Sequence, residues 1–99
     1  PEQVRVLPVR SDHQAYAASL LERLRSEGFR GSLAEADEPL GARIRKAKLE
    51  KLPYILVVGE ADVEAGTVGV NARGSDQPER DVAVDAFVGR LAAEILAKA

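Results

Sequence analysis

The chain has 99 residues, of which 45% are hydrophobic and 30% are charged, and its formal net charge is −2 at pH 7. These values are typical of one small globular domain spanning residues 1–99, and they exclude a disordered tail and a membrane span. With no cysteine and one histidine, the chain also lacks a disulfide framework and the ligands of an ordinary zinc site.

The first third of the chain predicts a strand, a helix and a second strand. An apolar run predicts a strand at 3–9 that lies inside the sheet. Ser11 and Gln14 have the spacing of a capping box, with Ser11 as the N-cap of a helix that carries one apolar stripe. His13 falls in the first turn of this helix and is expected to be a solvated surface residue. The segment 29–34 is short and contains a glycine, which predicts a strand near a sheet edge.

The middle of the chain predicts a basic helix followed by a central strand. Acidic residues and Pro39 stand at the start of the helix, where they suit its dipole and its free N–H groups. Leu40, Ile44 and Ala47 form one narrow apolar stripe. The rest of the helix surface is expected to be basic and to carry Arg43, Arg45, Lys46, Lys48 and Lys51. The apolar, β-branched run at 54–58 is typical of a strand covered on both faces near the middle of a sheet.

The remaining residues predict a hairpin and a closing helix. Residues 60–64 are polar and predict a connection, 67–71 a fourth strand, 73–76 a turn and 80–83 a short antiparallel strand. The final helix is expected to bury Val84, Phe87, Val88, Leu91 and Ile95. This order of elements predicts an α/β sandwich, in which helices cover both faces of a mixed sheet in three layers.

A long ordered pattern between residues 41 and 70 carries a family resemblance. Residues 41–59 read Gly-x-x-Ile-Arg-x-Ala-x-Leu-x-Lys-x-Pro-Tyr-x-Leu-Val-Val-Gly, and residues 63–70 read Val-Glu-Ala-Gly-Thr-Val-x-Val. The pattern resembles the C-terminal anticodon-binding domain of threonyl-tRNA synthetases, which are class IIa aminoacyl-tRNA synthetases. The resemblance implies a five-stranded mixed sheet with three helices. It also implies binding of the anticodon stem-loop of tRNA(Thr), while a separate catalytic domain charges the acceptor end.

The resemblance assigns anticodon contacts to residues on either side of the fourth strand. Glu64 and Arg73 match family positions that hydrogen-bond anticodon bases, and Asn71 replaces an arginine often found near them. A carboxylate accepts hydrogen bonds from guanine or cytosine amino groups, and arginine donates to carbonyl and phosphate oxygens. Without the resemblance, Glu64 is a turn acid and Arg73 a solvated loop charge.

The basic helix and the loop before it supply the other candidates. Asp37 and Pro39 replace a family asparagine and lysine implicated in anticodon recognition, and Glu38 stands between them. Asp37 can instead cap the helix. On the helix, Arg43 and Arg45 are the preferred RNA contacts, and Lys46 and Lys48 are expected to steer phosphates. The alternative is that these charged side chains only form the water-exposed face of a surface helix.

The sequence leaves three classes of function open. The preferred one is an RNA-binding module of a larger enzyme, without catalysis of its own. The second is a nucleotide-binding α/β domain, which is disfavoured because no Gly-x-Gly-x-x-Gly turn and no Walker loop is present. The third is a paralogous accessory or regulatory domain, or the corresponding domain of a histidyl-, prolyl- or glycyl-tRNA synthetase.

The preferred function predicts the cofactors, the binding partners and the cellular compartment of the domain. No cofactor is expected in this domain, because ATP, magnesium and zinc belong to the parent catalytic domain. The partners are the anticodon stem-loop of tRNA(Thr) and that catalytic domain, with no membrane involved. The isolated domain is expected to be monomeric. The N-terminal residues show no signal-peptide pattern, so a cytoplasmic setting is expected.

Overall fold

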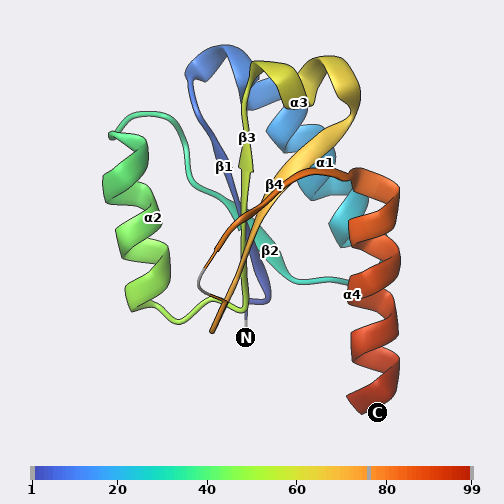
Figure 1. Cartoon of the computed structure of the whole chain (residues 1–99). Coiled ribbons are helices and arrows are strands. Elements are labelled where there is room, and N and C mark those ends of the chain that lie inside the picture. Colours follow the sequence, from blue (N-terminus) through green and yellow to red (C-terminus); the bar gives the residue numbers. More distant parts are fainter. Residues whose placement is uncertain (1, 76, 99) are drawn as a thin grey trace.

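The computed structural model describes residues 2–75 and 77–98, with the backbone alone from residue 95 onward (Figure 1). Its five strands form one sheet in the order β2-β1-β3-β4-β5. The strands are β1 (Val4–Pro8), β2 (Gly31–Leu33), β3 (Tyr54–Val58), β4 (Thr67–Ala72) and β5 (Glu79–Ala83). The helices are α1 (Gln14–Ser26), α2 (Leu40–Leu49), α3 (Glu60–Ala65) and α4 (Val84–Lys98), and a 3-10 turn spans Ser11–His13.

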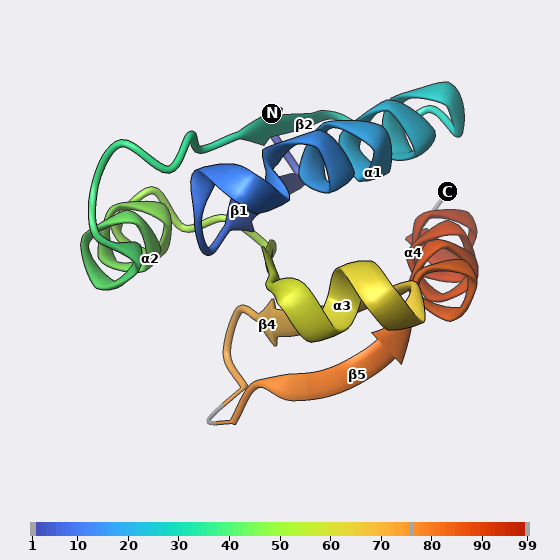
Figure 2. The same ribbon diagram turned by 90° about the horizontal axis from the view of Figure 1, so that it is seen from above.

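The sheet is mixed and lies between helices on both faces. Strands β1, β2 and β3 run parallel, whereas β4 is antiparallel to β3 and β5 is antiparallel to β4. Helices α1 and α4 cover one face, and α2 covers the other (Figures 1 and 2). These observations confirm the three-layer α/β sandwich, the central place of β3 and the edge position of β2.

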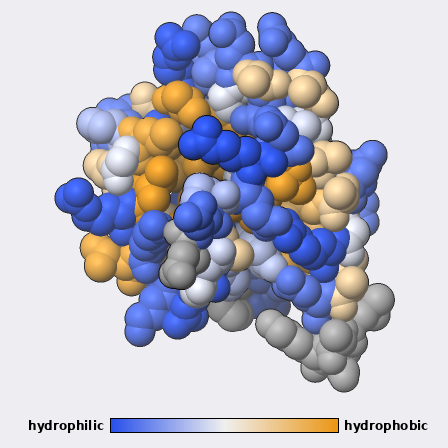
Figure 3. Space-filling model, viewed as in Figure 1, coloured by the Kyte–Doolittle hydropathy of each residue, from blue (hydrophilic) through white to orange (hydrophobic). Residues whose placement is uncertain are grey.

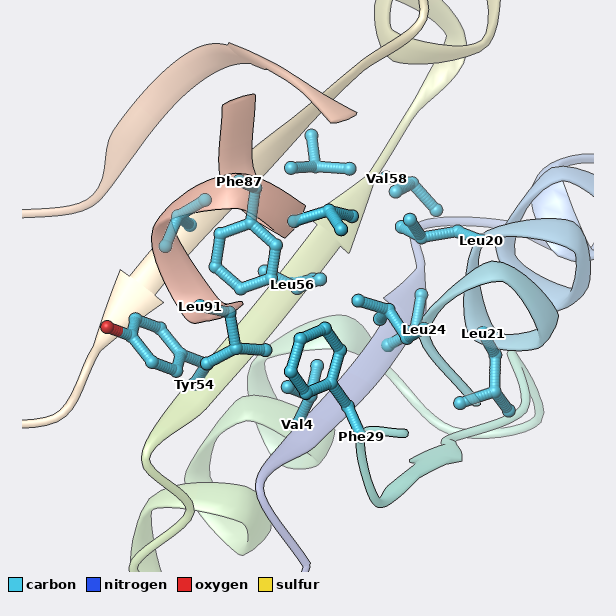
Figure 4. Close-up of a cluster of buried hydrophobic side chains, with 14 of the residues drawn as sticks. Val4, Leu20, Leu21, Leu24, Phe29, Tyr54, Leu56, Val58, Phe87 and Leu91 are labelled. Atoms are coloured by element: carbon cyan, nitrogen blue, oxygen red, sulfur yellow. The ribbon is translucent and has the colours of Figure 1, made fainter. Parts of the chain in front are cut away.

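The larger hydrophobic cluster lies between the sheet and the helices α1 and α4. Phe87 is fully buried and packs edge-to-face on Tyr54, with 5.3 Å between the ring centroids (Figure 4). The Tyr54 hydroxyl reaches the Glu94 carboxylate, with O–O distances of 2.5 and 2.6 Å. Burial, reinforced by this hydrogen bond, raises the pKa of Tyr54 to about 12. The predicted buried face of the last helix is confirmed for Phe87, Val88 and Leu91, while the Ile95 side chain lies outside the described residues.

The smaller cluster lies under α2 and is narrower than the sheet. Its buried members are Leu7, Ala47, Leu52 and Ile55, with the half-buried Leu40 and Ile44 packed against them. These residues come from β1, β3, α2 and the segment after α2, so α2 covers only the parallel part of the sheet. The same face of β4 and β5 is left without a helix over it.

Two expectations about the start of α1 are wrong. The helix starts at Gln14 after the 3-10 turn, and the N-cap of that turn is Arg10 rather than Ser11. His13 is only 6% exposed, and its Nδ1 accepts the Arg10 backbone N–H at 3.3 Å. The His13 ring turns back toward the N-cap residue Arg10. This position removes the ring from solvent and satisfies the free Arg10 N–H at the start of the turn.

The expected polar connection at 60–64 is instead the short helix α3, so the described part of the chain forms four α-helices, one more than the three expected. Asp62 accepts the Gly59 backbone N–H at 2.9 Å and the Thr67 hydroxyl at 2.7 Å. Gly66 ends the helix in the left-handed conformation, with φ of 70°. These two caps stabilise a helix too short to show an apolar period. The expected turn at 73–76 is described as far as Ser75, and Asp76 lies outside the described residues.

Candidate nucleic-acid interface

A groove runs between α2 and the β4–β5 hairpin, over the part of the sheet that α2 leaves uncovered. It consists of two adjoining hollows of about 380 and 330 Å³, which share Asn71 and Pro78. Asn71 pairs with Ile55 in the β3–β4 register, and Gly69 pairs with Val57, so these four residues form a floor that faces α2. On the face drawn in Figure 3, hydrophobic surface lies on the α2 side, and a further hydrophobic patch lies nearer α4.

The larger hollow lies next to α3, and we call it the α3 end of the groove. Ile44 and Val57 contribute apolar surface to it, and Asp62, Asn71 and Arg80 contribute polar groups. The two hydrogen bonds that Asp62 accepts from Gly59 and Thr67 fix its carboxylate in place. An apolar surface beside a fixed acceptor and an amide can hold a planar group with polar edges, such as a nucleic-acid base.

The smaller hollow lies between the α2–β3 loop and the β4–β5 turn, and we call it the turn end of the groove. Its cationic residues are Lys48, Lys51 and Arg73, and they surround a floor that includes Leu52 and Ile55. The Arg73 backbone N–H donates to the Pro53 carbonyl at 2.9 Å and so ties the two loops together. This end has the charge that suits an anion.

Arg43 does not lie on the basic surface where the sequence analysis placed it. Its side chain is buried, with 5% exposure, and the guanidinium donates to four backbone carbonyls. Nη1 reaches Pro8 O at 2.7 Å and Ala34 O at 3.1 Å, Nε reaches Glu38 O at 2.9 Å, and Nη2 reaches Val9 O at 3.3 Å. The sequence treats Arg43 as one basic residue among several, whereas its donors hold the end of β1 to the loop before α2. Arg43 is therefore a structural residue and is withdrawn as an RNA contact.

The structure does not bring Glu64 and Arg73 together. Glu64 is exposed on α3, just before β4, and Arg73 is exposed just after β4. The six residues of β4 separate them by roughly 20 Å. The α3 end of the groove is lined by Asp62 rather than Glu64. The two residues therefore lie at opposite ends of β4.

The remaining basic candidates lie on different sides of α2. Arg45 is exposed on the outer surface, beside a shallow hollow that it shares with Lys48 and Leu49, which is 77% exposed. Lys48 also reaches the turn end of the groove. Lys46 lies on the opposite side of the helix, in a separate hollow of about 460 Å³ toward β2.

That separate hollow also contains Asp37 and Glu38, and we call it the acidic hollow because its carboxylates outnumber its cations by four to three. Its other carboxylates include Glu50, which Arg5 binds with both guanidinium Nη atoms at 2.8 and 2.9 Å. This ion pair lowers the pKa of Glu50. Pro39 occupies the N-cap position of α2, with ψ of 145°, so Asp37 does not cap the helix. The carboxylates of this hollow distinguish it from the turn end of the groove, whose described lining residues carry only positive charges.

Three residues of the groove do not stand out in the sequence as site residues. Asp62 lies in a segment expected to be a polar connection, although its spacing from Gly59 is that of a helix N-cap and N3 residue. Ile44 belongs to the predicted apolar stripe of the helix, and it is half-buried because one side of it faces the groove. Arg80 carries no sequence signal that distinguishes it from other strand charges.

Within residues 2–75 and 77–98, no group of three or more histidine, cysteine, aspartate or glutamate side chains could hold a metal ion. No described helix is long and apolar enough to cross a membrane.

Comparison with known proteins gives the same family at the levels of sequence and fold. A family model described as "Anticodon binding domain" matches residues 3–94. The threonine–tRNA ligase of Caldanaerobacter subterraneus subsp. tengcongensis is 39% identical over 100% of this chain, and that of Lactiplantibacillus plantarum is 41% identical over 96%. The chain spans only 15% and 14% of the length of these two relatives.

A solved structure shows the same architecture. The RNA binding domain of threonyl-tRNA synthetase from Cryptosporidium parvum Iowa II superposes with a TM-score of 0.88 at 25% identity, over 94% of this chain and 23% of that chain. The family model covers well over half of the chain, and the two relatives match 100% and 96% of the chain. The chain therefore belongs to the anticodon-binding domain family and is similar throughout to the domain of this kind in threonyl-tRNA synthetases.

Proposed function

We propose that this domain binds the anticodon stem-loop of tRNA(Thr) as part of a threonyl-tRNA synthetase. The observation that carries the proposal is the groove beside α2, which combines apolar surface and fixed polar groups at one end with three cations at the other. Sequence-specific recognition of RNA uses unstacked bases of loops, held on flat surfaces and read along their edges. Membership in the anticodon-binding domain family supports the choice of ligand.

The α3 end of the groove is the proposed base-reading site. The Asp62 carboxylate can accept from the N1–H and amino group of guanine or from the amino group of cytosine. Asn71 can both donate and accept, and the apolar surface of Ile44 and Val57 can lie against the base. Glu64 and Arg45 lie outside this groove, and we assign them to the flanking nucleotides.

In this proposal the domain itself does not catalyse. It holds the anticodon loop while a catalytic part elsewhere in the parent protein, in a cytoplasmic setting, joins threonine to the acceptor end. ATP, magnesium and zinc would act in that catalytic part.

The test is a titration of the domain with the cognate stem-loop and with stem-loops that differ only in the anticodon bases, at one fixed salt concentration. We expect tighter binding of the cognate loop. Asn71→Ala should lower that preference by about 1–3 kcal/mol, or roughly 5- to 150-fold. Gln14→Ala, an amide lost from α1 on the other face of the sheet, is the matched control and should change nothing. Equal binding of all the stem-loops by the unaltered domain would refute anticodon recognition and favour an accessory domain.

A further inference from the structure

The turn end of the groove has an unusual concentration of positive charge. Lys48 and Lys51 approach it from α2 and the loop after it, and Arg73 approaches it from the β4–β5 turn. No carboxylate side chain is among the described residues that line this hollow, and none of the three cations forms an ion pair with a carboxylate that the structure describes. Like charges gathered in this way repel one another unless an anion lies between them.

The carboxylate that is nearest in sequence is held away from the hollow. Glu50 stands between the two lysines, but Arg5 on β1 binds both of its carboxylate oxygens from the β2 side of α2. Arg5 is bound in turn by Glu2. The Glu50 carboxylate therefore lies in the acidic hollow and does not neutralise the lysine charges of the turn end.

The backbone around the hollow is also fixed before any ligand arrives. Lys51 adopts the left-handed conformation, with φ of 60°, which is uncommon for a residue other than glycine. Its N–H donates to the Lys48 carbonyl at 3.0 Å, and the Arg73 N–H donates to Pro53 across the two loops at 2.9 Å. The positions from which the three cations extend are therefore set by the fold.

We propose that the turn end is a phosphate subsite, which binds a phosphodiester group of the RNA whose base occupies the α3 end. The inference rests on the proposed function and gives it chemical detail. Lysine ammonium groups act as point charges for phosphate, and the guanidinium of Arg73 can donate two parallel hydrogen bonds to it. The two ends share Asn71 and Pro78, so the base and the phosphate of neighbouring nucleotides can occupy them together. In this assignment Arg73 holds the backbone and reads no base.

Salt dependence of RNA binding tests the subsite. The logarithm of the binding constant falls with the logarithm of salt concentration, and each lost phosphate contact reduces the slope by about 0.7–0.9. Lys51→Gln and Arg73→Gln should each flatten the slope by that amount. They should weaken cognate and altered stem-loops by the same factor. Lys46→Gln is the control, because it removes one lysine charge from the neighbouring helix α2 on the side of the acidic hollow, and its slope should stay near that of the unaltered domain.

Several outcomes would overturn the subsite. Unchanged slopes for Lys51→Gln and Arg73→Gln would do so, as would equal flattening by Lys46→Gln. Loss of preference for the cognate loop in Arg73→Gln alone would return this residue to base reading. Circular dichroism melts of each variant distinguish these results from unfolding.

A second measurement separates this inference from the proposed function. Inorganic phosphate is titrated into the ¹⁵N-labelled domain, and saturable shifts of the amide signals of residues 48, 51 and 73, lost in Arg73→Gln, support the subsite even if no stem-loop binds. Binding of the stem-loop without these shifts, and with unchanged salt slopes, would leave the proposed function standing and refute the subsite.

Discussion

Replacement of Arg43 by methionine should lower the free energy of unfolding far more than the loss of any other charged side chain on α2. Methionine keeps most of the aliphatic stem and removes the guanidinium, so the four backbone carbonyls lose their donors. The bond to Pro8 O is buried, and the loss of its donor costs about 1–3 kcal/mol. The other three bonds are part-buried, and water can replace them at about 0.5–1 kcal/mol each. The expected total is about 2.5–6 kcal/mol.

That loss is large for a domain of this size. Small domains are stable by about 5–15 kcal/mol, and each kcal/mol lowers the Tm of a domain of this length by about 4–8 °C. We therefore expect the Tm of Arg43→Met to fall by more than roughly 10 °C, with a matching fall of the urea midpoint at unchanged m-value. Arg43→Lys should recover little, because one ammonium group cannot reach all four carbonyls on the two segments.

The control is Arg45→Met, which removes an exposed arginine two residues further along the same helix. It should change the free energy of unfolding by less than about 0.5 kcal/mol. If the two methionine variants unfold at the same urea concentration, the carbonyl bonds of Arg43 contribute no net stability. Its structural role would then have to be abandoned.

Ionisation and packing elsewhere in the domain give three more expected outcomes. The pKa of Tyr54 is about 12 in the folded domain and about 10 in the unfolded chain, so above pH 10 only the unfolded chain releases the proton and stability falls up to pH 12. Tyr54→Phe should make the urea midpoint less sensitive to pH in this window, and an unchanged pH profile would contradict the shift. Gly89→Ala, in the middle of α4 with no atom within 4 Å of the new Cβ, should raise stability by about 0.5–1 kcal/mol in thermal melts. Gly31→Ala should lower the free energy of unfolding by about 1–3 kcal/mol, because its Cβ would lie 2.9 Å from Leu21 Cδ1 and 3.1 Å from Val4 O. An unchanged free energy of unfolding would show that the edge strand moves enough to relieve these contacts.

The elements that the sequence predicts correctly are those with a strong hydrophobic period. The apolar run of β3 specifies a central strand because both of its faces are buried, and the stripes of α1 and α4 specify the helices that cover one face. Helix α3 gives no such signal, since six residues make fewer than two turns and none of them is buried. It depends instead on single capping contacts made by Asp62 and Gly66. Such contacts depend on backbone geometry, which the hydrophobic periodicity of a sequence does not reveal.

The site is less predictable than the fold, for a physical reason. Residues that are close in sequence can point to opposite faces of a strand or helix, so Lys46 and Lys48 belong to different hollows, of which only the turn end lacks a carboxylate among its described lining residues. Residue type also does not reveal burial when the partners are backbone carbonyls, which is why Arg43 resembles its exposed neighbours. Asn71 was included among the candidates, and the strand register that places it on the groove floor is a tertiary property.

The uneven cover of the sheet has a consequence for its motions. Strand β3 is paired on both sides and packed on both faces, whereas β5 has one paired neighbour and no helix over its groove side. Opening reactions of low free energy concentrate where few apolar contacts hold the backbone. In deuterium oxide, the amides of β5 should therefore exchange well before those of β3, and the wall of the groove moves on a faster timescale than its floor. A ligand held against both would slow exchange mostly in β5, which has no buried residue, and much less in the buried strands that set the global stability.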